Sequence, residues 1–167
     1  TYEVGPGKPY RELTEVADRL APGDVVEVQG DASYQSVSFD RAGSAAAKIT
    51  IRGVRVNGKR PTIAGGANTV ILYGSHTVFE GFEVTGGSAI CIVHKADDIT
   101  IRDTVVHGCT RHGILGTDAE SGSLLMEYVE VYDAGGELSG ENLKHPVYIA
   151  TDETMYPGSV FRMQHCY

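Results

Sequence analysis

A short pattern of alternating apolar and polar residues recurs along this chain and constrains its fold more than any other feature. Four six-residue segments align without gaps and a fifth follows more loosely: residues 51–56, 79–84, 101–106, 126–131 and 161–166. Alternation with a period of two is typical of β-strands. The segments begin roughly 22 to 35 residues apart, which is within the range of periods found in stacked repeats.

A second set of short apolar runs lies between these segments, at residues 70–73, 89–93, 113–115 and 147–149. Each repeat therefore contains two or three short strands and no helix. One such repeat cannot bury its own apolar face, so successive repeats stack and form columns of aliphatic side chains. The pattern predicts an all-β chain folded as a parallel β-solenoid, and the 21 glycines among 167 residues agree with frequent turns.

Only one segment, residues 10–20, has a helical period. Its apolar residues fall on one helical face: Leu13, Val16, Ala17 and Leu20. Pro22-Gly23 then ends the pattern. We therefore expect a short N-terminal helix that caps the first coil.

The whole chain, residues 1–167, is expected to form a single domain. The long last spacing predicts an insertion at residues 134–144, and insertions in solenoids emerge as loops that often line the binding side. Residues 159–167 have the pattern of a coil without a cap, which predicts the N-terminal part of a longer β-helix. An open last coil would expose a strand edge, so we expect self-association through residues 160–167.

The N-terminal segments resemble the start of the pectin-lyase-like right-handed parallel β-helix proteins. The resemblance rests on Tyr2-Glu3-Val4-Gly5-Pro6-Gly7, the helical segment, and Pro22-Gly23-Asp24 followed by a valine-rich strand. Residues 48–53, with the sequence Lys-Ile-Thr-Ile-Arg-Gly, are similar to the coil openings of this family. The resemblance implies a right-handed parallel β-helix with a short capping helix. It is weak for chemistry, because one fold supports many activities.

The resemblance further implies a shallow groove beside one sheet that takes an extended carbohydrate. Lyases of this fold remove the proton α to a uronate carboxyl group, which needs a base and groups that stabilise the developing charge. Asp97-Asp98 resembles the paired aspartates of the pectin hydrolases, but the further hydrolase motifs Asn-Thr-Asp, Gly-His-Gly and Arg-Ile-Lys are absent. The pectate lyase motifs are absent too, so the layout is nearer to the alginate and chondroitin lyases.

Residues suited to this chemistry precede two successive strands. Arg111-His112 comes before one strand and Lys144-His145 before the next, so stacking places the two pairs above one another. We expect Lys144, His145 and Tyr148 to be catalytic, with Lys144 as base and Tyr148 as acid, and Arg111 and His112 to bind substrate. The alternative is that these are ordinary corner residues, with histidines that pack in turns and a lysine that extends over the surface.

Acidic residues follow the same two strands. Stacking brings four carboxylates together, which predicts a Ca²⁺ site formed by Asp118, Glu120, Asp152 and Glu153. The alternative is a set of solvated corner carboxylates.

Charge and composition limit the partners. The net charge of −8 argues against nucleic acid as a partner and favours a calcium-assisted approach to an acidic polymer. No run approaches the roughly 20 apolar residues of a membrane span.

Cys91, Cys109 and Cys166 include no Cys-x-x-Cys pair, so zinc is not expected. Buried free thiols are expected, and a single disulfide is the alternative.

Together these features predict a secreted or periplasmic lyase that cleaves acidic, uronate-containing polysaccharide by β-elimination. The competing hypothesis is a non-catalytic β-helix that binds carbohydrate or serves as a surface or adhesin-like protein.

Overall fold

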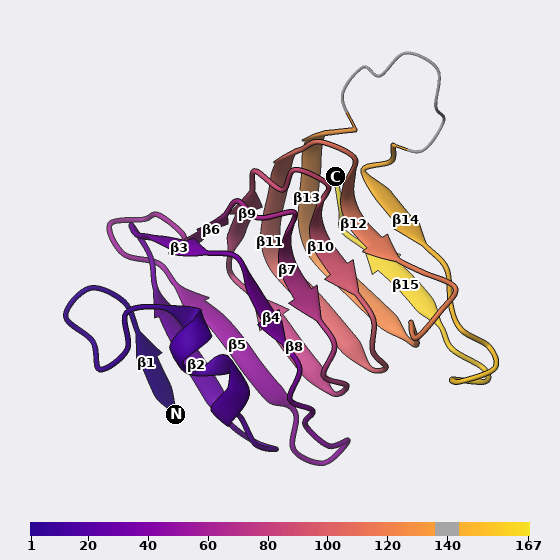
Figure 1. Cartoon of the computed structure of the whole chain (residues 1–167), viewed down its shortest axis with the longest axis horizontal. Coiled ribbons are helices and arrows are strands. Elements are labelled where there is room, and N and C mark those ends of the chain that lie inside the picture. Colours follow the sequence, from indigo (N-terminus) through magenta and orange to yellow (C-terminus); the bar gives the residue numbers. More distant parts are fainter. Residues whose placement is uncertain (136–143) are drawn as a thin grey trace.

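The chain folds as a right-handed parallel β-helix whose coils stack from the N-terminus to the C-terminus (Figure 1). The computed structural model describes residues 1–135 and 144–167. Every pair of neighbouring strands in both sheets is parallel. The predicted all-β fold class is therefore confirmed.

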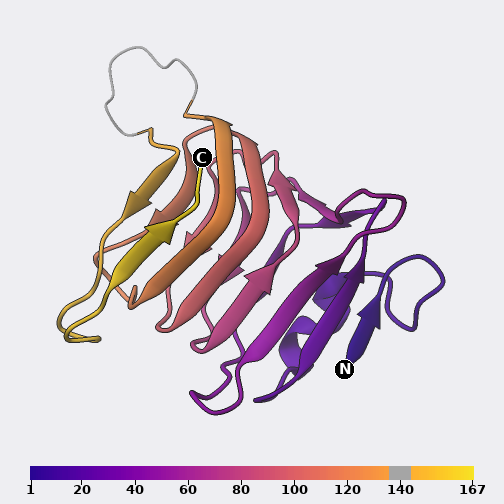
Figure 2. The same cartoon turned by 180° about the vertical axis from the view of Figure 1, so that it is seen from behind.

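The strands form two sheets that wrap around one core (Figures 1 and 2). The larger sheet contains β1 (Tyr2–Val4), β2 (Val25–Gln29), β3 (Ser33–Gln35), β5 (Ile49–Val54), β6 (Thr62–Ala64), β8 (Thr77–Glu80), β9 (Glu83–Thr85), β11 (Ile99–Cys109), β13 (Leu124–Ala134) and β15 (Phe161–Gln164). The smaller sheet contains β4 (Val37–Phe39), β7 (Asn68–Leu72), β10 (Ile90–His94), β12 (His112–Gly116) and β14 (Val147–Ile149).

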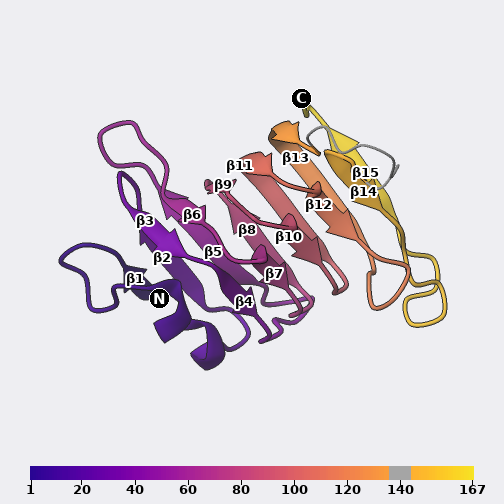
Figure 3. The same ribbon diagram turned by 45° about the horizontal axis from the view of Figure 1, so that its top comes forward.

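The larger sheet bends at a corner, so the β-helix has three faces. The long strand β11 pairs with β8 through its first half and with β9 through its second half. We call the face with β2, β5 and β8 the first face and the face with β3, β6 and β9 the second face. The smaller sheet is the third face. Figure 3 shows the stack from a tilted direction.

The register confirms most of the repeat alignment. Ile51, Phe79, Ile101 and Met126 pair in one continuous column, and all four are fully buried. The alignment of the fifth repeat is wrong by two residues, because Met126 pairs with Met163 and not with Phe161. A shift of two residues keeps every side chain on the same face of a strand, so the alternating pattern alone cannot detect it.

The predicted N-terminal helix consists of two short 3₁₀ turns, Leu13–Glu15 and Ala17–Arg19. Leu13, Val16, Ala17 and Leu20 are buried, as their spacing predicts. The backbone of Val16, at φ −115°, separates the two turns. The turns lie against the first coil and cover its core (Figure 1).

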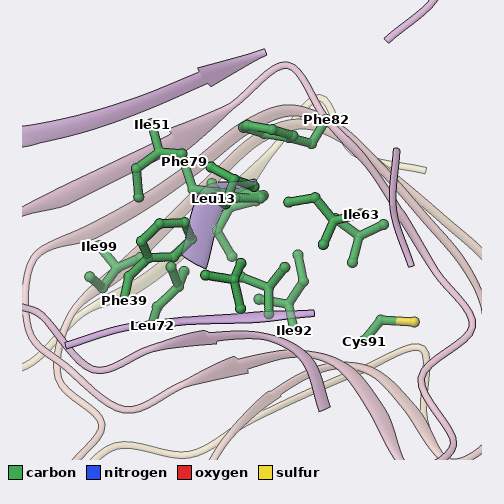
Figure 4. Packing of buried hydrophobic residues seen from close by; sticks show 14 of the residues in the cluster. Leu13, Phe39, Ile51, Ile63, Leu72, Phe79, Phe82, Cys91, Ile92 and Ile99 are labelled. Atoms are coloured by element: carbon green, nitrogen blue, oxygen red, sulfur yellow. The ribbon is translucent and has the colours of Figure 1, made fainter. Parts of the chain in front are cut away.

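Aromatic and aliphatic side chains fill the interior between the faces (Figure 4). Phe79 stacks on Phe82 with ring centroids 4.4 Å apart, and Phe39 lies 6.5 Å from Phe79. These three rings are almost completely buried and are the largest of the fully buried side chains by volume.

The corners of successive coils share an unusual backbone conformation. Positive φ angles recur at two corner columns, formed by Gly81, Asp103, Tyr128 and His165 and by Gly65, Gly86, Gly108 and Asp133. Glycine adopts this conformation at no steric cost, and aspartate tolerates it better than most residues. Close stacking adds a further demand at Gly53, where a Cβ atom would lie 2.3 Å from the carbonyl oxygen of Gly81. The high glycine content therefore follows from the coil geometry.

Charged residues alternate along the outer side of the first face. Glu80 accepts from Arg52 Nε at 2.7 Å and lies 3.3 Å from Arg102 Nε. Glu27 and Glu127 extend the ladder at 4.0 Å from the two arginines. Opposite charges directly across parallel strands favour this register.

The expectation of free buried thiols is wrong for two of the three cysteines. Cys91 and Cys109 form a disulfide, whereas Cys166 is free. Both bonded cysteines are buried, as expected, but β10 and the end of β11 bring their Cα atoms to 5.6 Å. That separation is within the range that a disulfide requires.

The predicted insertion lies mostly outside the described residues: Ala134 ends β13, and residues 136–143 are not described. Phe161 and Met163 on β15 are exposed, and self-association through this coil stays a prediction. In the described part of the chain, no helix is long and apolar enough to cross a membrane.

One buried histidine makes the fold sensitive to acid. His94 lies in the core with Nε2 3.1 Å from the carbonyl oxygen of Gly122, and burial lowers the pKa of its imidazole. Its pKa in the unfolded chain is about 6.5, so the unfolded state binds more protons as pH falls below that value. We therefore expect the free energy of unfolding to decrease from about pH 6.5 downward.

The test compares urea unfolding at neutral and mildly acidic pH. His94→Leu should be less stable at neutral pH, because Gly122 loses its donor, but its stability should fall less on acidification. The exposed His165→Leu should keep the slope of the unmodified chain. An unchanged slope in His94→Leu would show that His94 is not the group responsible.

Candidate functional site

The outer side of the third face carries the residues that the sequence selects. Along β7, β10, β12 and β14, one outward column contains Ile71, Val93, Leu115 and Tyr148. The residues between them, such as Ile92 and Ile114, point into the core. The strand periodicity therefore brings Tyr148 to the surface, where it is half exposed.

Three rings meet where β12 and β14 begin. His145 stacks between the others, with its centroid 5.8 Å from that of His112 and 5.4 Å from that of Tyr148. The His112 and Tyr148 centroids are 6.1 Å apart. The pairing of Ile114 with Val147 sets this alignment, so the predicted stacking of the two histidine-bearing segments is confirmed.

His112 is held as a neutral donor. Its Nδ1 accepts a hydrogen bond from the backbone N–H of His145 at 3.2 Å. Burial, followed by the charges of Arg111 and His145, lowers the pKa of its imidazole. A neutral ring whose Nδ1 accepts must carry its proton on Nε2. The ring, of which 8% of the residue surface is exposed, therefore has its N–H group at Nε2.

Two cations flank the ring cluster. Arg111 precedes β12 and is exposed, while Lys144 lies at the corresponding position before β14. The Cβ atom of Lys144 is 3.1 Å from the position that a Cβ would take on Gly135. The charge of Arg111 reaches His112, where it helps to lower the pKa of the imidazole, and a guanidinium group can bind a carboxylate.

The four predicted calcium ligands lie in neighbouring turns, but their carboxylates have other roles there. Asp152 accepts from the backbone N–H groups of Glu120, Thr154 and Met155, and these bonds lower the pKa of its carboxyl group. Glu120 pairs with Lys95 at 3.1 Å.

The remaining two predicted ligands are Glu153 and Asp118. Glu153 accepts from Thr151 Oγ1 at 3.1 Å and from the Gly158 N–H at 3.0 Å, and Asp118 is exposed. Among the residues that the structure describes, no group of three or more His, Cys, Asp or Glu is arranged to hold a metal ion. Calcium binding at these turns stays a prediction.

A thermal shift experiment tests that prediction. If these turns bind calcium, saturating calcium should raise the midpoint of unfolding, because a ligand at 100 times its Kd adds about 2.7 kcal/mol. Asp118→Asn should reduce the shift, whereas Glu130→Gln on the second face should not. An equal midpoint with calcium and with a chelator would contradict the calcium site.

Sequence reasoning missed two residues on this face. Lys95 Nζ lies 6.0 Å from the ring centroid of Tyr73. The two residues occupy equivalent positions, because Lys95 directly follows β10 and Tyr73 directly follows β7. Tyr73 is partly exposed and offers an aromatic surface beside a cation. The equivalent positions of the two residues after their strands could have been read from the sequence. A single position after a strand does not show which face of the β-helix its side chain lies on, so the contact was not predicted.

The fold is similar to that of solved carbohydrate-active enzymes. An alginate lyase from Paenibacillus sp. str. FPU-7 aligns over 74% of this chain and 42% of its own, with 18% identity and a TM-score of 0.67. Pectate lyase Pel9A aligns over 99% and 46%, with 13% identity and a TM-score of 0.77. A pectin methylesterase from Aspergillus niger aligns over 99% and 64%, with 12% identity and a TM-score of 0.61.

The chain spans less than half the length of the first two of these structures. At these identities the similarity shows the parallel β-helix fold, which confirms the structural resemblance inferred from the sequence. No family model and no curated protein matches the chain by sequence.

Proposed function

We propose that this chain belongs to a protein that cleaves acidic, uronate-containing polysaccharide by β-elimination at the third face. The observation that carries the proposal is the cluster of His112, His145 and Tyr148, in which Arg111 and Lys144 directly precede the two histidines in the sequence. The named activities of two fold neighbours, an alginate lyase and a pectate lyase, support the same substrate class.

The roles follow from charge and proton capacity. Arg111 and the Nε2–H of His112 would receive the uronate carboxylate and stabilise the charge that develops when the α proton leaves. Lys144, with His145 beside it, would take that proton. Tyr148 would donate a proton to the departing glycosidic oxygen as the bond to the β carbon breaks. A carbon–carbon double bond forms between the α and β carbons, so no water is consumed.

The disulfide supports a secreted or periplasmic location. Bonds of this type persist in oxidising compartments and are rare in the cytosol. Cys91 and Cys109 are both buried and bonded. An extracellular location also gives access to polysaccharides, which are too large to cross a membrane unaided.

The test measures ultraviolet absorbance from unsaturated uronate ends after incubation of the whole protein with alginate, polygalacturonate or chondroitin. His145→Ala and Tyr148→Phe should lower the rate by about 10²–10⁴, the usual effect of losing a general acid or base. The matched controls are His165→Ala and Tyr128→Phe, because these two rings also stack, at 5.0 Å, but at a distant corner.

The non-catalytic hypothesis gives a different result. A binding module would yield no unsaturated product yet would bind immobilised acidic polysaccharide, and Arg111→Ala would weaken that binding. If all three polymers give no product and show no binding, both hypotheses are contradicted.

A further inference from the structure

A second cluster of reactive side chains lies on the second face, away from the ring cluster. Thr85, His107 and Tyr132 share one outward column on β9, β11 and β13. Glu83, two residues before Thr85, reaches diagonally to His107, with Oε1 2.8 Å from Nε2. The other ring nitrogen, Nδ1, is 3.4 Å from Thr85 Oγ1.

The contacts fix the orientation of the imidazole. A carboxylate only accepts hydrogen bonds, so the proton of neutral His107 lies on Nε2 and faces Glu83. Nδ1 then presents its lone pair to the hydroxyl of Thr85. Tyr132 stacks on the ring at 4.9 Å with an interplanar angle of 1°, and Thr62 Oγ1 donates to Glu83 Oε2 at 3.2 Å.

This arrangement is that of a nucleophile, a general base and an acid that orients the base. Such triads are recognised by geometry and roles, and the bond between nucleophile and base is often long before substrate binds. His107 and Glu83 remain partly exposed, with 22% and 38% of their side-chain surface accessible. The group is therefore open to a ligand.

Gly108 lies directly beside the hydroxyl and leaves it uncovered, because any side chain at this position would press against it. Gly108 has a positive φ of 63°, and the position that its missing Cβ would occupy is 2.8 Å from Thr85 Oγ1. The backbone nitrogen of Gly86, the residue after Thr85, lies 3.9 Å from the same position.

We propose that Thr85, His107 and Glu83 form an acyl-transfer site that hydrolyses carboxylic esters. The site lies on an open sheet surface, which fits an ester group carried on an extended polymer. It uses none of the residues assigned to the third face, so it stands or falls independently of the lyase proposal.

The proposed reaction balances with water as the only co-reactant. Thr85 Oγ attacks the ester carbonyl while its proton passes to His107 Nδ1, and Glu83 stabilises the imidazolium. The ester C–O bond breaks, and the leaving alcohol takes the proton from His107. Water then attacks the acyl-Thr85, giving its proton to His107, and the acid leaves as Thr85 regains the proton.

The experiment uses 4-nitrophenyl acetate as the probe, with acid quenching and peptide mass spectrometry. The unmodified protein should carry an acetyl group on Thr85. Thr85→Val, which keeps the shape of the side chain, should lose the adduct and the associated nitrophenol release. Thr85→Ser should retain both, and His107→Gln should lower the rate by about 10²–10⁴. Thr50→Val on the first face is the matched control.

Glu83 acts through His107 and is a positioning residue. Glu83→Gln should slow acylation and change its pH profile, whereas Glu83→Asp should restore part of the rate. Unfolding curves establish that each variant is folded. A folded protein with unmodified Thr85, or a folded Thr85→Val that releases nitrophenol at the unmodified rate, would overturn the proposal and leave the cluster as a polar contact between coils.

Discussion

Phe79→Ala is expected to lower the free energy of unfolding by about 3–5 kcal/mol, the usual cost of removing a buried phenylalanine ring. Phe79 has no exposed surface, stacks on Phe82 at 4.4 Å, and lies in the inward column that runs through every central coil. Because rigid strands surround the ring on both sides, the cavity has little room to collapse. Urea unfolding followed by circular dichroism measures the change.

Two comparisons make this prediction specific. Phe79→Leu keeps most of the apolar volume and should cost much less than the alanine variant. Tyr128→Ala removes an aromatic ring that is 61% exposed, so its effect should stay within about 1 kcal/mol. Equal losses for Phe79→Ala and Tyr128→Ala would contradict the placement of the inward column.

Removing the disulfide should cost about 3 kcal/mol. Cys91 and Cys109 are 18 residues apart, and closing a loop of about this length restricts the unfolded chain by that amount in the chain-entropy model. The paired variant Cys91→Ala/Cys109→Ala removes the bond without leaving a buried free thiol. Its midpoint of thermal unfolding should fall by several degrees, since roughly 2–4 °C corresponds to 1 kcal/mol at this chain length.

Reduction provides an independent measure of the same bond. A thiol reductant should destabilise the unmodified protein by about as much as the paired variant and should not affect that variant further. Cys166→Ala, which removes the free cysteine, should respond to reductant like the unmodified chain. A midpoint that does not move on reduction of the unmodified protein would show that the bond adds no stability.

The sequence predicts the coils well because every coil has the same structural requirements. Each coil needs an apolar residue at the same inward position, so Ile51, Phe79, Ile101 and Met126 could be aligned by pattern alone. The register of the last coil was predicted wrongly. Pairing Met126 with Phe161 or with Met163 gives the same alternating pattern, so the pattern does not distinguish the two registers. The N-terminal helix was located correctly, but a spacing pattern does not distinguish one helix from two 3₁₀ turns.

Contacts between coils explain what could be predicted at the site. The sequence placed His112 beside His145 because both precede strands of the same column. It could not show that Asp152 would bind the backbone N–H groups of its own turn, because such bonds depend on the path of the corner. The contact between Glu83 and His107 was also hidden, as it crosses diagonally between two coils.

The mass of the released oligosaccharides tests the central claim most directly. If the third face cleaves acidic polysaccharide by β-elimination, the whole protein should release fragments from alginate, polygalacturonate or chondroitin that carry one unsaturated uronate end. No water is added in that reaction, so the fragment masses should sum to the mass of the uncut chain. Fragments heavier by one water per cut would indicate hydrolysis, and either that result or uncut polymer would contradict the elimination mechanism.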